Sequence, residues 1–195
     1  MVVSNVKVYG LRDSIKASKY PMSTDITKLN DEMTSTVVKL AQSKKGEGHD
    51  NFLNGIVVQF DLTFTVKAWV EAERYHFLDF VSSQSTMHKI TKFDLDNAYI
   101  RYVDDRIIEI MKEKVNEYNK LSELKYTPKN LLDEKYLEIL YSNPCGFRLT
   151  ARMTTNYRQL KTIYSQRKTH RLKEWRSFCE FIECLPYAKE LIVGE

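Results

Sequence analysis

The sequence predicts an α+β, or irregular α/β, fold that forms a single domain over residues 1–195. Apolar and polar residues alternate along two segments, 56–66 and 147–154, which is the pattern of half-buried strands. Segments with helical spacing of apolar residues lie between and after them, without a regular strand–helix–strand repeat. This mixture argues against a doubly wound parallel sheet, and a chain of this length fits one core.

The composition is that of an ordinary globular protein. Hydrophobic residues make up 43% of the chain and charged residues 29%, with only 6 Gly and 4 Pro. No apolar run approaches the roughly 20 residues that a membrane-spanning helix needs, and the first ten residues lack the apolar stretch of a signal peptide. The three cysteines, Cys145, Cys179 and Cys184, show no C-x-x-C spacing. We therefore expect a cytoplasmic protein with reduced thiols and no membrane partner.

The N-terminal part is predicted to form a strand and two helices. Weak alternation over 5–11 indicates the strand, and a short helix over 13–20 ends at Pro21. A longer helix over 24–44 begins with a good capping residue at its first or second position. Its apolar residues recur at helical spacing: Ile26, Leu29, Met33, Val37 and Leu40.

The middle of the chain is predicted to be mainly helical. The strand over 56–66 leads directly into a helix over 69–80, and the polar run 82–86 predicts a loop. A polar loop next to buried structure is a candidate ligand site. A long helix follows over 96–121, capped by its first or second residue, and another over 130–141 ends before a proline and a glycine.

The C-terminal part combines a cationic strand with a long helix. The strand over 147–154 has arginines on one face only. The final helix is predicted to begin at Thr154, Thr155 or Asn156, which are all good capping residues, and to continue to about residue 185.

Basic residues are concentrated in this C-terminal part. Residues 145–176 contain nine basic residues and one acidic residue, a net charge of +8, so the rest of the chain carries −4 of the overall +4. A basic block in an otherwise acidic chain indicates an anionic partner, which would be nucleic acid, a nucleotide or a phosphorylated cofactor. A solvated cationic face is the alternative explanation.

Two arginines, Arg167 and Arg171, interrupt the apolar face of the final helix. A buried guanidinium is costly unless an anion pairs with it, so these side chains should meet a carboxylate, a bound phosphate or a subunit interface. The alternatives are that the helix breaks near 168–170, or that the arginine stems carry their charges to water. The start of the helix, beside Asn156 and Arg158, is either an anion site or an ordinary helix cap.

Several catalytic classes have no support in the sequence. The four histidines, His49, His76, His88 and His170, lack the spacing of metal ligands, so no metal centre is expected. The pair Gly46-x-Gly48 lacks the remainder of a dinucleotide or phosphate-loop fingerprint, and no G-x-S-x-G elbow occurs.

Three blocks of residues follow one another in a suggestive order. The first is Gly48-His49-x-x-Phe52, which leads into the strand over 56–66. The second is Arg74-Tyr75-His76, followed by the run from Ser82 to His88. The third is Asn156-x-Arg158-x-Leu160, followed by Arg167, His170 and Glu174-Trp175.

Together these blocks resemble the motifs of the flavin-dependent thymidylate synthases, the ThyX family. The corresponding family patterns are G-H-x-x-x-x-E-H, then R-H-R with S-x-R seven residues later, then N-x-R-x-L with a following L-R and H-A-Q-W-E. The resemblance implies a ThyX-like domain with a central, mostly antiparallel sheet and flanking long helices. It also implies a homotetramer that binds FAD and dUMP at subunit interfaces.

The family activity implied by the resemblance is a methyltransferase reaction. A methylene group passes from methylenetetrahydrofolate to the uracil of dUMP or a related pyrimidine nucleotide, and NADPH reduces the flavin. Position by position, the resemblance assigns Arg74, His76, Asn156 and Arg158 to the cofactor.

The resemblance assigns two further residues to the nucleotide. Ser85 and Arg167 would bind it, and Ser85 would also position the substrate for catalysis. The sequence departs from the family at three arginine positions, which hold Phe77, Met87 and Leu140.

Two alternatives to a methyltransferase stay open. The first is a catalytically inactive homologue that keeps the fold and binds a nucleotide or acts as an assembly subunit. The second is a nucleic-acid-binding module, resting on the basic block and on Tyr157 and Tyr164, which would stack bases. The second is less favoured because no RRM, KH or helix-turn-helix signature occurs in the sequence.

Overall fold

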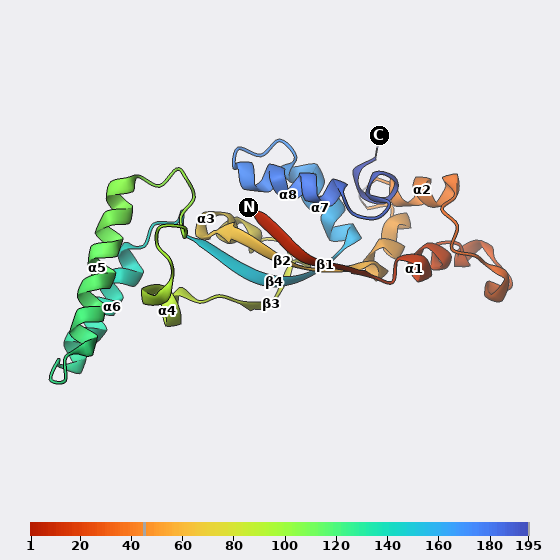
Figure 1. Cartoon of the computed structure of the whole chain (residues 1–195). Helices are drawn as coiled ribbons and strands as arrows, with labels where there is room; N and C mark the ends of the chain where they lie inside the picture. Colours follow the sequence, from red (N-terminus) through yellow and green to blue (C-terminus); the bar gives the residue numbers. More distant parts are fainter. Residues whose placement is uncertain (45, 195) are drawn as a thin grey trace. The chain divides into compact units, whose positions relative to one another are not determined.

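The structure, a computed structural model, describes residues 1–44 and 46–194 (Figure 1). Contacts within the chain divide it into two compact units. The first unit comprises Met1–Leu62, Glu71–Ser82 and Ala151–Glu195, and the second comprises Thr63–Val70 and Ser83–Thr150. No helix in the described ranges is long and apolar enough to cross a membrane.

A four-stranded antiparallel sheet with helices confirms the predicted α+β class. The strands lie in the order β1 (Val2–Tyr9), β2 (Val57–Thr65), β4 (Arg148–Asn156) and β3 (Asp79–Ser83). The two central strands show the alternating burial that predicted them, because successive side chains of a strand point to opposite faces. Their alternating buried residues are Val58, Phe60, Leu62, Phe64, Ala151, Met153 and Thr155.

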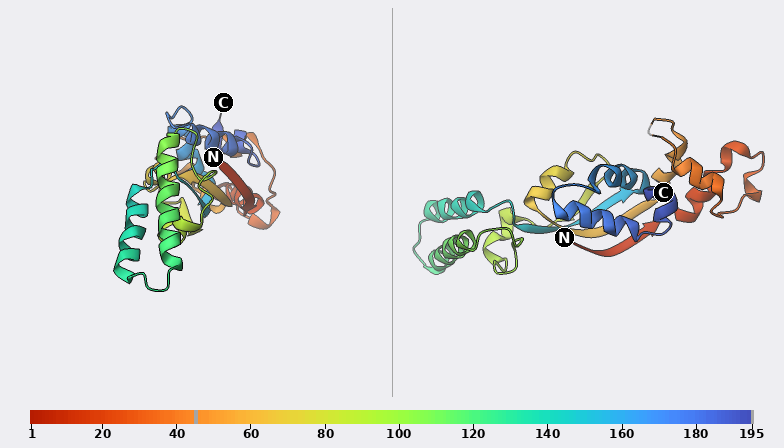
Figure 2. Two further views of the ribbon diagram at one scale, coloured as in Figure 1. Left: turned by 60° about the vertical axis from the view of Figure 1, so that its left-hand side comes forward. Right: turned by 90° about the horizontal axis from the view of Figure 1, so that it is seen from above.

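Within the first unit, α7 (Tyr157–Arg167) and α8 (Lys173–Glu183) cover one face of the sheet (Figures 1 and 2). The ring of Phe60 on β2 lies 5.7 Å from that of Phe178 and 5.4 Å from that of Phe181, both on α8. The short π-helix η5 (Lys189–Val193) packs beside α7. This apolar contact between sheet and helices forms the core of the unit.

The segment predicted as one helix over 24–44 forms separate short elements, so that prediction is wrong. After α1 (Leu11–Ala17) and η1 (Tyr20–Met22), the chain forms η2 (Ile26–Lys28), α2 (Ser35–Ala41) and η3 (His49–Gly55). Asp25 caps η2, and Thr34 caps α2 by accepting a hydrogen bond from the backbone N–H of Val37. A second capping residue inside the apolar pattern therefore starts a new helix.

The helix predicted over 69–80 ends early, and its last part is a strand. The helix is α3 (Val66–Ala72), and Phe80 belongs to β3 together with the first two residues of the predicted loop over 82–86. Pairing of β3 with β4 at the edge of the sheet overrides the local helical spacing.

The second unit contains a helical hairpin. Helices α5 (Asp105–Glu123) and α6 (Lys129–Ser142) lie side by side, next to α4 (Thr86–Lys89) and η4 (Ile90–Lys92) in the chain's second unit (Figures 1 and 2). The long helix begins at a cap on Asp104 instead of at residue 96 or 97. Residues 98–100 are held by backbone pairing with 146–148, which removes them from the helix.

The final helix predicted over 154–185 is divided into α7 and α8. Residues 154–156 still belong to β4, and Asn156 is the capping residue among the three predicted ones. Helix α7 ends at Arg167. This confirms the helix break near 168–170 that the sequence indicated as one alternative.

We expect Gly10→Ala to destabilise the first unit strongly. Gly10 has a φ of 68°, and a Cβ there would lie 2.4 Å from the carbonyl oxygen of Gly55. The left-handed backbone conformation and the clash with the Gly55 carbonyl both destabilise the variant, so we expect the free energy of unfolding to fall by about 2–4 kcal/mol. Urea unfolding measures it.

The matched control is Gly46→Ala. Gly46 has a φ of 98°, but within the described part of the chain no atom lies within 4 Å of a Cβ built there. Only the backbone cost of about 1 kcal/mol remains. Equal losses for the two variants would contradict the close approach at Gly10.

Candidate functional site

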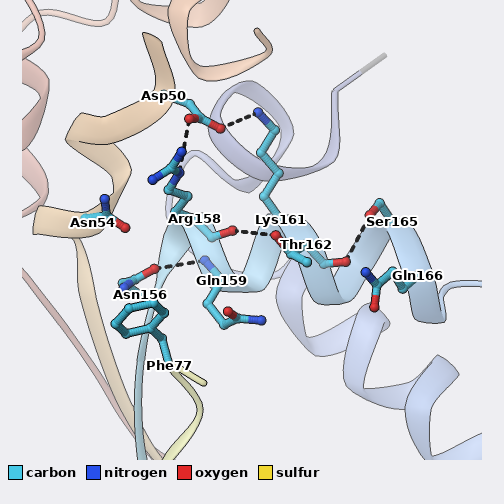
Figure 3. Close-up of a pocket in the computed structure, with 10 residues that line it drawn as sticks. All are labelled: Asp50, Asn54, Phe77, Asn156, Arg158, Gln159, Lys161, Thr162, Ser165 and Gln166. Atoms are coloured by element: carbon cyan, nitrogen blue, oxygen red, sulfur yellow. Dashed lines mark hydrogen bonds and ion pairs between the residues drawn. The ribbon is translucent and has the colours of Figure 1, made fainter. Parts of the chain in front are cut away.

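A cavity of about 440 Å³ lies beside the outer face of α7 (Figure 3). All of its lining residues belong to the first unit and come from η3, the loop before β3, the last residue of β4, and α7. They are Asp50, Asn54, Phe77, Asn156, Arg158, Gln159, Lys161, Thr162, Ser165 and Gln166. The volume lies in the range of small-molecule sites.

Helix α7 separates this cavity from the core. Asn156 caps it, with Oδ1 accepting a hydrogen bond from the backbone N–H of Gln159 at 2.8 Å. The buried residues of the helix are Tyr157, Leu160, Ile163, Tyr164 and Arg167, and the remaining face is mostly polar. The helical repeat thus turns the apolar residues to the core and the polar ones to the cavity.

A buried carboxylate organises the cations at the cavity. Asp50 is 6% exposed, and its two oxygens lie 3.1 Å from Nε of Arg158 and 2.9 Å from Nζ of Lys161 (Figure 3). Lys161 also donates to the backbone carbonyls of Ala41 at 2.6 Å and Ser43 at 3.0 Å. The lysine therefore ties the end of α2 and η3 to α7.

The Arg167 guanidinium is buried elsewhere in the first unit, between three elements. It is 4% exposed and pairs with Glu71 at 2.8 Å, and its Nε donates to the hydroxyl of Tyr75 at 2.7 Å. Its Cζ lies 4.6 Å from the ring centroid of Trp175, and Nη1 lies 2.7 Å from Nε2 of His170. The sequence predicts a carboxylate, a bound phosphate or a subunit interface as the partner of Arg167, and in the structure the partner is the Glu71 carboxylate.

The pKa of His170 is lowered by its burial and by the positive charge of Arg167, against the opposing effect of Glu71. Its Nδ1 accepts a hydrogen bond from the backbone N–H of Leu172 at 3.2 Å. Both effects favour the neutral imidazole at the turn that connects α7 to α8.

The structure brings only part of the predicted cofactor set to the cavity. Asn156 and Arg158 line it, whereas Arg74 and His76 are exposed on the loop between α3 and β3. Phe77, the next residue of that loop, does line the cavity. Ser85 lies in the second unit, where its carbonyl accepts a hydrogen bond from the N–H of Lys89 at 3.1 Å.

Sequence reasoning missed the acidic partners of these cations. Asp50 and Glu71 have no motif that marks them, apart from the position of Asp50 directly after His49 in the first block. Their pairs join residues 90 or more positions apart, which no local pattern reveals.

Most of the basic block is engaged inside the protein. Arg148 and Arg176 donate to backbone carbonyls, and Arg152 pairs with Asp61 at 3.2 Å. Arg158, Lys161 and Arg167 are paired as described above. The side chains of Lys168, Arg171 and Lys173 lie at the surface. In the described ranges, no three histidine, cysteine, aspartate or glutamate side chains form a group that could hold a metal ion.

We expect Arg167→Ala to lower the free energy of unfolding by about 2–3 kcal/mol, because it leaves the Glu71 carboxylate without its buried partner. Glu71 keeps some access to water, with 24% of its side chain exposed, which moderates the loss. Urea unfolding measures the effect. Arg171→Ala, at an exposed arginine in the next turn of chain, is the control and should change stability by less than about 0.5 kcal/mol. Similar losses for both would contradict the buried pair.

We expect the stability to fall as the pH drops below 6.5, the ordinary pKa of the His170 imidazole. The folded state lowers this pKa, so the unfolded state binds more protons between the two values, and the free energy of unfolding rises with pH there. Asp61 and similar carboxyl groups, whose pKa is lowered from 3.8, titrate below this window. Urea unfolding at pH 5, 6 and 7 measures how the free energy of unfolding changes with pH. His170→Gln should reduce this pH dependence, whereas the control His88→Gln, at an exposed histidine, should leave it unchanged.

Comparison with protein-family models gives no match, and comparison with curated protein sequences gives none. Among solved structures, the chain resembles the flavin-dependent thymidylate synthase ThyX of Helicobacter pylori, determined with FAD and dUMP in two structures. The TM-score is 0.71 at 13% identity, over 98% of this chain and 97% of that one. It also resembles the UMP/dUMP methylase PolB of Streptomyces cacaoi bound with 5-Br dUMP, with a TM-score of 0.60 at 15% identity over 92% and 89% of the two chains. The chain therefore has a ThyX-like fold.

Proposed function

We propose that this protein is a flavin-dependent methyltransferase of the thymidylate synthase type. It would transfer a methylene group from methylenetetrahydrofolate to dUMP or a related pyrimidine nucleotide, with FAD as cofactor and NADPH as reductant. The observation that carries the proposal is the likeness of fold, over nearly the whole chain, to two proteins solved with dUMP or a brominated dUMP. The three sequence blocks that resemble the ThyX motifs support it.

The residues at the cavity fit a phosphorylated, planar group. Arg158, with 37% of its side chain exposed, offers a cation, and Asn54 and Gln159 offer amide groups. Phe77 is 60% exposed and offers an aromatic face at the position where the family has an arginine. When bound, the flavin would supply the hydride chemistry of the reductive step.

The protein's own groups would bind and orient the two ligands. Arg158 would bind a phosphate of the cofactor, and Asn156 would fix the start of α7 beside it through its cap. Arg74 and His76 are proposed to complete the cofactor site, as a homotetramer with sites between subunits would allow. A cytoplasmic location remains part of the same proposal.

Ser85 and Arg167 are each proposed to contact the nucleotide, at a site between subunits of the proposed homotetramer. Because Arg167 already pairs with Glu71, direct binding of a phosphate requires the nucleotide to replace that carboxylate. Ser85 would position the nucleotide through its hydroxyl.

A second candidate function is a non-catalytic protein of the same fold that binds a nucleotide or serves as an assembly subunit. The pairing of Arg158 with Asp50 and of Arg167 with Glu71 favours it, because these cations are stable without a ligand. The replacement of three family arginines by Phe77, Met87 and Leu140 favours it as well. A nucleic-acid-binding module is less supported, because most of the basic block is engaged internally.

We expect the purified protein to bind FAD and Arg158→Ala to bind it about ten- to a hundredfold more weakly, the usual effect of losing one charge-assisted contact. Titration of FAD into the apoprotein, followed by flavin fluorescence, measures both affinities. Arg171→Ala removes an exposed cation that does not line the cavity and is the matched control.

Two results would count against this reading. Absence of FAD binding by the wild type at high micromolar concentration would overturn the flavoenzyme and leave the non-catalytic homologue. Equal binding by Arg158→Ala and wild type would overturn the assignment of Arg158 while leaving the function in place.

A further inference from the structure

The buried Asp50 carboxylate is an unusual group to find at the edge of a cavity proposed for an anionic ligand. It contributes a negative charge to a wall that otherwise carries two cations, Arg158 and Lys161. It is fixed on η3, a 3-10 helix that follows the capping residue Gly48 and packs against α7. A fixed carboxylate at this place opposes the approach of a phosphate.

Lys161 has no capacity left for a ligand. An ammonium group has three donors, and those of Lys161 are used by the carbonyls of Ala41 and Ser43 and by Asp50, at 2.6, 3.0 and 2.9 Å. All three acceptors are held by the fold. Lys161 therefore acts as a clamp, a side chain on α7 whose three hydrogen bonds hold the end of α2 and η3 against that helix, and Asp50 balances its charge.

Arg158 is engaged on one edge only. Asp50 takes its Nε at 3.1 Å, and no ion pair or hydrogen bond to another described residue occupies its two Nη groups. Because a guanidinium has five donors in a planar fork, the Nη edge keeps the capacity to bind an anion while the Nε edge stays on Asp50. The side chain is partly exposed at the cavity, which makes this edge accessible.

We propose that Asp50 is an internal counter-anion that sets the anion affinity of the cavity. It neutralises the Lys161 clamp and holds Arg158 in place, so that an incoming phosphate meets a single guanidinium edge next to a fixed negative charge. This inference rests on the proposed function in taking the cavity as the place for the phosphates of a cofactor. Removing the charge while keeping the shape of the side chain strengthens anion binding.

Inorganic pyrophosphate is the probe, because it tests the charge balance of the site without the rest of a cofactor. Calorimetry compares wild type, Asp50→Asn and the control Asp61→Asn at low salt. Asp61 also pairs with an arginine, Arg152 at 3.2 Å, but does not line the cavity. We expect Asp50→Asn to bind pyrophosphate about three- to tenfold more tightly than wild type, with a gain that shrinks as salt is added.

The control and a double variant assign the gain to this site. Asp61→Asn should leave the pyrophosphate affinity unchanged, and Asp50→Asn combined with Arg158→Ala should lose the gain. Equal or weaker binding by Asp50→Asn, an equal gain in Asp61→Asn, or no pyrophosphate binding by any variant would each overturn the inference. If Asp50→Asn does not fold, Asp50→Ser keeps a hydrogen-bond acceptor in a smaller side chain and is interpreted in the same way.

FAD titration of the same variants separates this inference from the proposed function. If pyrophosphate binds more tightly to Asp50→Asn and no variant binds FAD, the counter-anion is supported and the flavoenzyme fails. If FAD binds and pyrophosphate shows no gain, the flavoenzyme is supported and the counter-anion fails.

Discussion

The burial of the Arg167 guanidinium determines how the segments of the first unit meet. A charge that is 4% exposed is stable only where an anion and further acceptors surround it. Glu71 at the end of α3, Tyr75 on the following loop and Trp175 on α8 provide that environment. Glu71 and Tyr75 lie 96 and 92 positions before Arg167 in the chain, so the contacts of this one side chain fix the loop before β3 against both C-terminal helices.

The same constraint explains why α7 and α8 are separate helices. A single straight helix would carry Arg167 and Trp175 along one axis, about 12 Å apart at 1.5 Å per residue. The observed stacking, with 4.6 Å between the guanidinium carbon and the ring centroid, requires the chain to turn between them. The turn also carries His170 to the Arg167–Glu71 pair. Fixing the loop before β3 in this way holds Phe77 at the wall of the cavity.

The sequence predictions succeeded where an element depends on residues close together in the chain, and failed where it depends on contacts between distant segments. Alternation predicted β2 and β4 well, because the burial of one sheet face repeats every second residue. The prediction of one helix over 24–44 was wrong because a second cap at Thr34 starts a new helix. The prediction of a helix over 69–80 was wrong because its last residues pair with the sheet as part of β3. The cap and cation at Asn156 and Arg158 were predictable from a local motif, and both line the cavity. Asp50 and Glu71 were not, because their role arises only when distant segments pack together.

The charge pairs place different demands on the two proposed ligands. Arg167 is almost fully buried with Glu71, so a nucleotide phosphate reaches it only by displacing a carboxylate from a site with little water. Arg158 keeps one edge accessible, so a cofactor phosphate adds to it without displacing Asp50. Under the proposed function, cofactor binding therefore needs no rearrangement of ion pairs, whereas nucleotide binding at Arg167 includes the cost of separating a buried pair. The proposed nucleotide site is thus the more demanding of the two, and a loss of catalysis would begin there while the cavity beside α7 still bound an anion.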